Sequence, residues 1–261
     1  IIMLNKSVNA ISDTYVLAKR NVKRNFRVPQ LLIFSSAQPI IFLLLFNFVF
    51  GGAVAGTSEE KYIFFLLPGI MAQIALFGSI QTGVGLAEDL NKGVIDRLRS
   101  LPITRSAVLA GRTFADSARN VFVIALITIV GIILGFRIEQ GYAKFFAAML
   151  LVLLFAYSFS WVSANIGMWL KDSETVQVAG FLWVFPLVFA SSVFVPVATM
   201  PSWLQGFAQN QPVTQVVNAV RYLAVGGVPN GQHYIYATIL WSLGIIAVFA
   251  PLAIRMYRKI Q

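Results

Sequence analysis

The sequence contains no cysteine and a single histidine, His233. The first absence excludes disulfide bonds, a thiolate nucleophile and a cysteine-based metal site. One histidine cannot build a histidine-rich metal site by itself. The chain also lacks a G-x-x-x-x-G-K-[ST] motif, so it has no P-loop to hold nucleotide phosphates. We therefore expect no metal, cofactor or catalytic site in this chain, and any ATP-driven process needs a nucleotide site on another polypeptide.

Charged residues are scarce as well. Asp, Glu, Lys and Arg make up 11% of the 261 residues, whereas 58% are hydrophobic, and the mean hydropathy is +0.77. About a quarter of the residues of an ordinary soluble domain are charged. A soluble chain of this length needs more polar surface than this to cover its core. The composition therefore predicts a protein whose solvent is largely lipid.

The sequence is rich in long apolar runs. Crossing about 30 Å of hydrocarbon takes about 20 helical residues, and six runs are long enough. None of them contains Asp or Glu, and Arg119, at the edge of the third, is the one Lys or Arg inside their limits. The runs predict an all-α membrane protein with a six-span domain over residues 31–261. Its spans would lie near residues 31–50, 62–86, 118–136, 145–169, 176–198 and 234–254.

The net charge of +10 sits in short blocks between these runs, which is typical of membrane topology rather than of a nucleic-acid groove. Sixteen of the twenty Lys and Arg lie before the first run, in the second and fourth connections, or after the last run, when Arg119 at the edge of the third run is counted with the second connection. Cytoplasmic segments of membrane proteins carry the excess of Lys and Arg. We therefore expect both termini to be cytoplasmic, which agrees with an even number of spans.

Two segments outside the runs carry apolar residues at helical spacing. Residues 5–28 combine an apolar stripe with Lys and Arg over the remaining surface, which favours an amphipathic helix in the cytoplasmic interface over a solvated basic helix. This helix would make 1–30 a separate cytoplasmic segment. On the outer side, 199–233 predicts a hairpin of a short apolar helix and a second helix that begins at Pro212 and ends at Gly226. Neither is long enough to cross, so we expect re-entrant or amphipathic helices.

The second cytoplasmic connection, residues 87–112, is longer than topology requires. It contains both signs of charge, with apolar residues at near-helical spacing among them, and Gly93 and Pro102 interrupt it. A simple topology loop explains its arginines but not Ile95, Leu98 and Leu101. A short helix that docks on a cytosolic partner explains both features, so we expect this connection to bind another protein.

The run GLAEDLNKGVIDRLRSLPITRSAVLAGR, residues 85–112, resembles the cytoplasmic segment of ABC-2 type permeases. It is most similar to the daunorubicin-resistance permease branch, which includes actinobacterial drug and lipid exporters. Three further stretches, Leu67–Ile70, Gln211–Thr214 and Arg221–Leu223, resemble that family in the same order. The resemblance covers most of the chain.

The resemblance implies a permease subunit of an ATP-driven ABC exporter in a bacterial plasma membrane. Two permeases, identical or homologous, would pair and sit on cytosolic ABC ATPase subunits, which would hold the ATP and Mg²⁺. The cargo would be an amphiphilic lipid or drug-like molecule. We call residues 87–112 the coupling segment, since they match the family region that contacts the ATPase. The docking argument selects Ile95, Leu98 and Leu101 as anchors of this contact. The full set of contact residues that the resemblance implies is Asp89, Gly93, Ile95, Asp96, Arg97, Leu98, Arg99, Leu101, Pro102 and Arg105.

Two other functions are open to a membrane protein of this composition. An ion-coupled secondary transporter usually needs ionisable groups near the bilayer midplane, and the predicted spans contain amides but no carboxylate. For a membrane-embedded enzyme, the candidate catalytic residues are His233 and the Glu88–Asp89 pair, but no neighbouring residue completes a catalytic pattern with them. Polar span residues are better candidates for lining a substrate route: Gln38, Asn47, Gln73 and Asn165.

The topology can be tested with single cysteines, because the chain has none of its own. Thr57→Cys, Gln140→Cys and Asn230→Cys should react with a membrane-impermeant thiol reagent added outside intact cells. Lys92→Cys and Asp172→Cys should react only after the cells are opened. The reverse labelling pattern would contradict the orientation.

Overall fold

A computed structural model describes residues 16, 19, 29–51, 59–93 and 105–259, without the side chains of 29–35, 59–61, 105–110, 115 and 258. All regular structure in this part of the chain is helical. The predicted interfacial helix over 5–28 lies outside it, apart from Val16 and Lys19. In chain order the elements are α2 (Pro29–Leu45), the π-helix η1 (Phe46–Phe50), α4 (Glu59–Asn91), α6 (Arg105–Ile133), α7 (Tyr142–Leu170), α8 (Ser173–Phe189), the 3₁₀-helix η2 (Val197–Thr199), α9 (Ser202–Asn210), α10 (Pro212–Ala224) and α11 (Gly231–Lys259).

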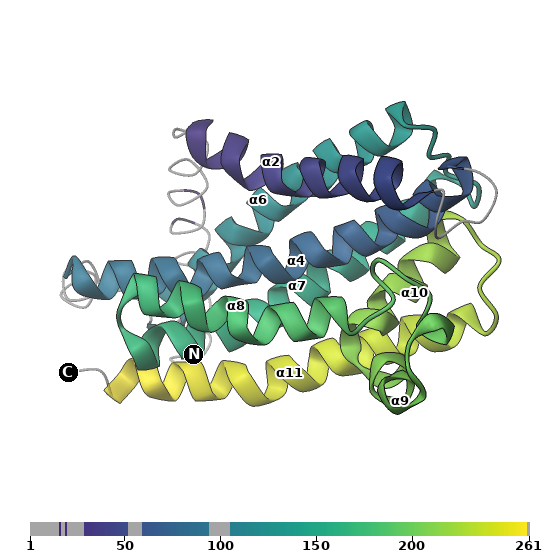
Figure 1. Ribbon diagram of the computed structural model, residues 1–261. Coiled ribbons are helices and arrows are strands. Elements are labelled where there is room, and N and C mark those ends of the chain that lie inside the picture. The colour runs from purple at the N-terminus through teal and green to yellow at the C-terminus, as the bar shows by residue number, and fades with distance from the viewer. Residues whose placement is uncertain (1–15, 17–18, 20–28, 52–58, 94–104, 260–261) are drawn as a thin grey trace.

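These helices form a bundle in which α2, α4, α6, α7, α8 and α11 alternate in direction (Figure 1). The last turns of α4 and α11 and the first turn of α8 share one end of the bundle, and α9 and α10 lie at the other (Figure 1). Four helices are long and apolar enough to cross a membrane, and two shorter apolar helices, Ser36–Phe50 and Ser173–Phe189, accompany them. The all-helical class is confirmed for the described residues, whereas the count of six spans stays a prediction.

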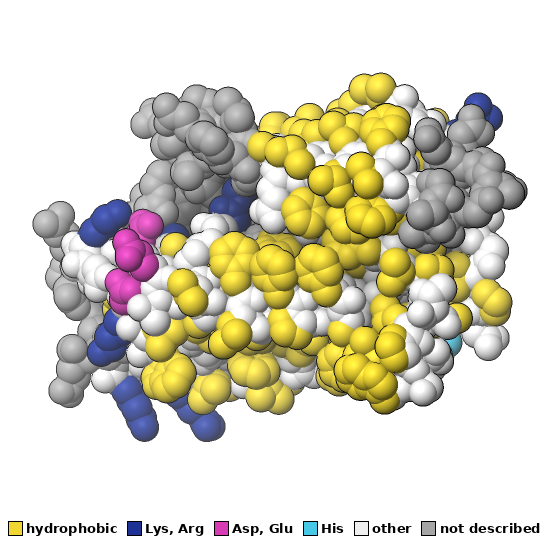
Figure 2. Space-filling model, viewed as in Figure 1, with side chains coloured by type: hydrophobic (Ala, Val, Ile, Leu, Met, Phe, Trp, Pro, Cys, Tyr) yellow, Lys and Arg dark blue, Asp and Glu magenta, His cyan; other side chains and the backbone are white. Residues whose placement is uncertain are grey.

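On the face of the bundle shown in Figure 2, apolar side chains cover the middle and charged side chains gather toward the ends. Leu182 on α8 and Leu240 on α11 are 78% and 75% exposed. Side chains of this kind are unfavourable in contact with water and stable against lipid tails. The exposed surface therefore agrees with a membrane location.

Helix α4 is the centre of the bundle and contacts α2, α6, α7, α8 and α10. Its closest approach is to α7, where glycines let the two backbones touch. A Cβ at Gly83 would lie 2.4 Å from the carbonyl oxygen of Ser163, and one at Gly167 would lie 2.3 Å from that of Gly83. Small residues at helix–helix contacts are typical of packing in membranes, where van der Waals contact replaces the hydrophobic effect.

The helices differ in length from the apolar runs that predicted them. Helix α4 continues to Asn91 and α6 already begins at Arg105, because a helix extends beyond the hydrocarbon while its apolar run does not. The fifth span was predicted to run from 176 to 198, but α8 ends at Phe189, so the predicted span is too long. The amide of Gln211 donates to the Leu187 and Ala190 carbonyls there, which satisfies acceptors that a helix end leaves open.

The predicted helix at 212–225 is present as α10, and its valine stripe is buried as expected. Val213, Val216, Val217 and Val220 are all 0% exposed. The same stripe predicts polar surroundings for Gln215, Asn218 and Arg221, and Arg221 does bind polar groups. Gln215 and Arg221 are nevertheless buried, because α10 packs against α4, α7 and α11. Gly226 and Gly227 follow the helix with φ of 85° and 71°, a conformation that favours glycine.

The burial of α10 gives a matched pair of test substitutions. Val217→Asp places a charge in the core and should destabilise the fold by several kcal/mol. Asn218→Asp should cost far less, because Asn218 Oδ1 already accepts a hydrogen bond from Arg221 at 3.0 Å and a carboxylate keeps that acceptor. Thermal unfolding in detergent, followed by size-exclusion chromatography, measures both. Equal stability of the two variants would contradict the observed packing.

Candidate functional site

The two helices that flank the predicted coupling segment are joined by polar contacts, called here the α4–α6 clamp. Arg112 Nη1 forms an ion pair with Asp89 Oδ2. One turn further into the bundle, Thr82 Oγ1 donates a hydrogen bond to Asp116 Oδ2 over 2.7 Å. Positions 112 and 116 share one face of α6 because they are four residues apart. Gly85 on α4 provides the room, since a Cβ there would collide with the Arg112 guanidinium.

Asp116 corrects one conclusion from the sequence. The predicted spans held no carboxylate, but the apolar helix of α6 runs from Gly111 to Ile133 and includes Asp116, which is 5% exposed. It was missed because the third run was taken to begin at 118. A buried carboxylate is costly without partners, and Thr82 supplies one on the facing helix.

The predicted ATPase-contact residues are only partly described. Asp89 lies in the last turns of α4, where it forms the clamp, and Gly93 follows the helix with φ of +64°. Arg105 is the first residue of α6, and its side chain is not described. The other seven residues fall in 94–104, outside the described part of the chain. Their contact with an ATPase stays a prediction.

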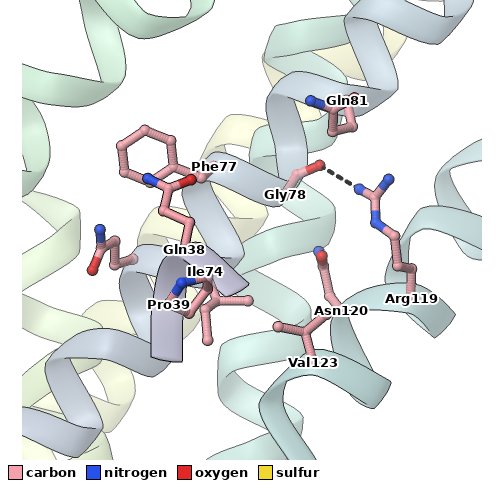
Figure 3. A pocket seen from close by; sticks show the side chains of 10 residues that line it. Gln38, Pro39, Ile74, Phe77, Gly78, Gln81, Arg119, Asn120 and Val123 are labelled. Atoms are coloured by element: carbon pink, nitrogen blue, oxygen red, sulfur yellow. Dashed lines mark hydrogen bonds between the residues drawn. The ribbon is translucent and has the colours of Figure 1, made fainter. Parts of the chain in front are cut away.

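Of the four predicted route residues, two meet in one pocket. Gln38 of α2 and Gln73 of α4 line a pocket of about 100 Å³, together with Phe77 of α4 and Arg119 and Asn120 of α6. Figure 3 shows Gln38 beside Phe77, with Arg119 and Asn120 on the facing helix. We call this space the α2–α4–α6 pocket. Sequence reasoning had placed Arg119 at a span edge and did not select Asn120.

The other two route residues lie elsewhere. Asn47 is buried within the π-helix η1. Asn165 of α7 donates to the Trp161 carbonyl at 2.7 Å and to the Phe249 carbonyl of α11 at 2.9 Å, so it ties these two helices together. Of the four predicted route residues, Gln38 and Gln73 thus share a pocket, whereas Asn47 and Asn165 lie at two other places in the bundle.

A second polar cluster, centred on Arg221, holds α10 in place. Its guanidinium makes five hydrogen bonds, to the Phe65 carbonyl, the Ser192 hydroxyl and carbonyl, and the Asn218 amide. It also stacks 3.5 Å over the Phe65 ring. Pro68 lies one turn along α4, and a proline frees carbonyls in the preceding turn. Burial lowers the pKa of Arg221.

This cluster explains two of the stretches that the sequence analysis singled out. Leu67–Ile70 and Arg221–Leu223 lie far apart in sequence, but Arg221 binds the Phe65 carbonyl one turn before Pro68. A Cβ at Gly69 would lie 2.3 Å from the Val193 carbonyl oxygen, so α4 also meets the loop after α8 closely. Tyr62 donates to the Phe194 carbonyl over 2.8 Å. The sequence placed Arg221 in the predicted outer helix, and its charge gave no signal of burial.

A bundle of apolar helices with exposed apolar side chains along its surface is typical of a multi-pass membrane protein. The sequence comparisons identify the family. Residues 12–225 match the ABC-2 type transporter family, and the chain belongs to it.

Named relatives span most of the chain. A daunorubicin resistance ABC transporter permease protein of Streptomyces coeruleorubidus is 36% identical over 250 residues, which cover 96% of this chain and 87% of the relative. A probable doxorubicin resistance ABC transporter permease protein of Mycobacterium tuberculosis is 26% identical over 95% of this chain and 89% of its own length. An inner membrane transport permease of Escherichia coli is 23% identical over 81% and 80%.

The clamp can be tested by a double-mutant cycle with Asp89→Asn and Arg112→Gln. The pair is largely shielded from solvent, so we expect a coupling energy of about 1 kcal/mol, or about 2–4 °C in the midpoint of thermal unfolding. The matched control is the exposed pair of Glu88 and Lys92, 3.2 Å apart, whose coupling should be near zero. Equal coupling in the two cycles would contradict a role for the clamp.

Proposed function

We propose that this chain is the transmembrane half of an ATP-driven exporter that moves an amphiphilic drug-like or lipid molecule across the plasma membrane. It would work with a second permease and with cytosolic ABC ATPase subunits that bind ATP and Mg²⁺. Family membership and relatives named for daunorubicin and doxorubicin resistance support this function. The absence of a P-loop motif from the sequence agrees with an ATPase on a separate chain.

The observation that carries the proposal is the α4–α6 clamp. The coupling segment, residues 87–112, starts in the last turns of α4 and ends in the first turns of α6. Because Asp89 pairs with Arg112 and Thr82 with Asp116, a force applied to the segment acts on both helices together. Helix α4 then transmits the displacement, since it contacts α7, α8 and α10. Nucleotide binding by the ATPases would in this way change the packing of the two permeases.

The bundle end that holds the clamp would face the cytoplasm, with both chain termini on that side. The last turn of α11 and the connection from α7 to α8, which carry Lys259 and Lys171, lie at the same end as the last turn of α4, which agrees with the excess of Lys and Arg on the cytoplasmic side. The end with α9 and α10 would face outward. There Arg221 fixes α10 against α4, so a movement of α4 reaches the outer end as well.

Asp116 bears on the alternative function, an ion-coupled secondary transporter. A buried carboxylate is a usual proton carrier in such proteins. Here it accepts a hydrogen bond from Thr82 and lies one turn from Arg112, which suits a structural role. ATP-dependent export that survives collapse of the proton and sodium gradients supports the exporter. Gradient-driven transport by this chain alone would favour the alternative.

The coupling segment gives the most specific prediction. Leu98→Asp should leave membrane insertion intact but uncouple transport, because burying a leucine against a partner contributes about 1.5–3 kcal/mol, at least tenfold in association. Arg97→Glu should have a milder effect that depends on salt, as is usual for charges at the rim of an interface. Pull-down of the ATPase and ATP-dependent export measure both. Full association and full export by a folded Leu98→Asp protein would show that the segment is only a topology loop.

A further inference from the structure

The α2–α4–α6 pocket contains polar groups that the protein itself leaves without partners. Gln73 Oε1 and Asn120 Nδ2 are buried atoms with no hydrogen-bond partner among the described residues. Both residues line the pocket, and they are 3% and 2% exposed. A buried polar atom without a partner costs about 1–3 kcal/mol. A molecule bound in this cavity would find unused hydrogen-bonding capacity at both residues.

Arg119 adds a cation to the same pocket. Its Nη2 donates to the Gly78 carbonyl over 3.1 Å, and no carboxylate of the described residues lies within ion-pair distance of it. Asp116, one turn away, is directed to Thr82 instead. The Arg119 guanidinium therefore has donors and a positive charge available for a ligand.

The position of Arg119 along α6 narrows the source of that ligand. At a rise of about 1.5 Å per residue, Arg119 lies about 21 Å along α6 from Ile133, so an α6 that spans a hydrocarbon core of about 30 Å holds Arg119 inside that core. Close in sequence to the pocket residues, Ile41 of α2 and Val121 and Phe122 of α6 expose apolar side chains. A ligand that reaches Arg119 along this surface passes apolar side chains, which favours a molecule with acyl chains.

We infer that the α2–α4–α6 pocket binds the headgroup of an anionic phospholipid. Phosphate oxygens would accept from Arg119 and Asn120 Nδ2, and a headgroup hydroxyl would donate to Gln73 Oε1. Pro39, Phe77 and Val123 would contact the glycerol and the first methylenes of the acyl chains. A volume of about 100 Å³ suits one headgroup, whereas drug-sized ligands occupy about 300–1,000 Å³.

The hydrogen-bonding groups and the charge of the pocket favour some lipid headgroups over others. Phosphatidylglycerol offers both a phosphate anion and hydroxyl donors, while phosphatidylcholine offers no donor for Gln73 Oε1 and brings a quaternary ammonium close to Arg119. The binding itself does not depend on the proposed export function.

The experiment is lipid retention by the purified full chain, without an ATPase, after reconstitution in nanodiscs of phosphatidylcholine with or without phosphatidylglycerol. Native mass spectrometry counts the lipids that stay bound after release into detergent. The wild type should retain phosphatidylglycerol in preference to phosphatidylcholine. Arg119→Gln should lower that retention roughly tenfold or more, because it removes charge-assisted hydrogen bonds. Gln38→Leu, at the exposed rim of the pocket, should lower it less.

The matched control is Arg255→Gln, which removes the same charge from an exposed position on α11 outside the pocket. It should retain phosphatidylglycerol as the wild type does. Equal retention of the two lipids by the wild type overturns the inference, and this holds even if Arg119→Gln fails to fold. Wild-type retention by a folded Arg119→Gln protein overturns it as well. Soluble glycerol phosphate added to the release buffer distinguishes the sources: an unchanged count supports a lipid headgroup, and displacement shows that a free phosphate ester occupies the site instead.

Discussion

Inside a bilayer no water is present to hydrogen-bond a polar group, so each such group has to find its partner within the protein. In this bundle the partners converge on α4. Its C-terminal half meets Arg112 and Asp116 of α6 through Asp89 and Thr82, and in its N-terminal half the Phe65 carbonyl accepts from Arg221 of α10. Next to Thr82, Gly83 brings α4 against the backbone of α7. One helix therefore joins α6, α7 and α10.

This arrangement connects the family resemblance to physical contacts. The stretch at 85–112 contains Asp89 and Arg112 of the clamp, while Arg221 binds the Phe65 carbonyl one turn before Pro68. Each polar cluster joins α4 to another helix. Where pairing is incomplete, at Gln73, Arg119 and Asn120, the chain leaves room for a ligand rather than for another side chain. Polar groups at membrane depth thus serve two purposes, to fix helices and to bind.

Apolar periodicity was enough to predict the positions of the helices, including α10 with its valine stripe and the glycines that end it. It could not predict where helices extend past the hydrocarbon, so the start of α6 and the burial of Asp116 were missed. Arg221 was assigned to the outer surface because a lone arginine carries no signal of the carbonyls it will bind. Gln38 and Gln73 line the same pocket because of how α2 crosses α4. The pattern of residues along the sequence does not show how helices cross. Residues 94–104 hold most of the predicted contact set and remain a prediction from sequence.

The central claim is that the connection between α4 and α6 is the surface through which an ATPase acts on this permease. Site-specific photocrosslinking in the assembled complex measures this contact most directly. A photoreactive amino acid at position 98 or 101 should crosslink to the ATPase chain, with a yield that changes when nucleotide is added. The same probe at Gln140, at the opposite end of the bundle, should not. An ATPase that crosslinks to Lys171 or Lys259 but not to positions 98 and 101 would contradict the account.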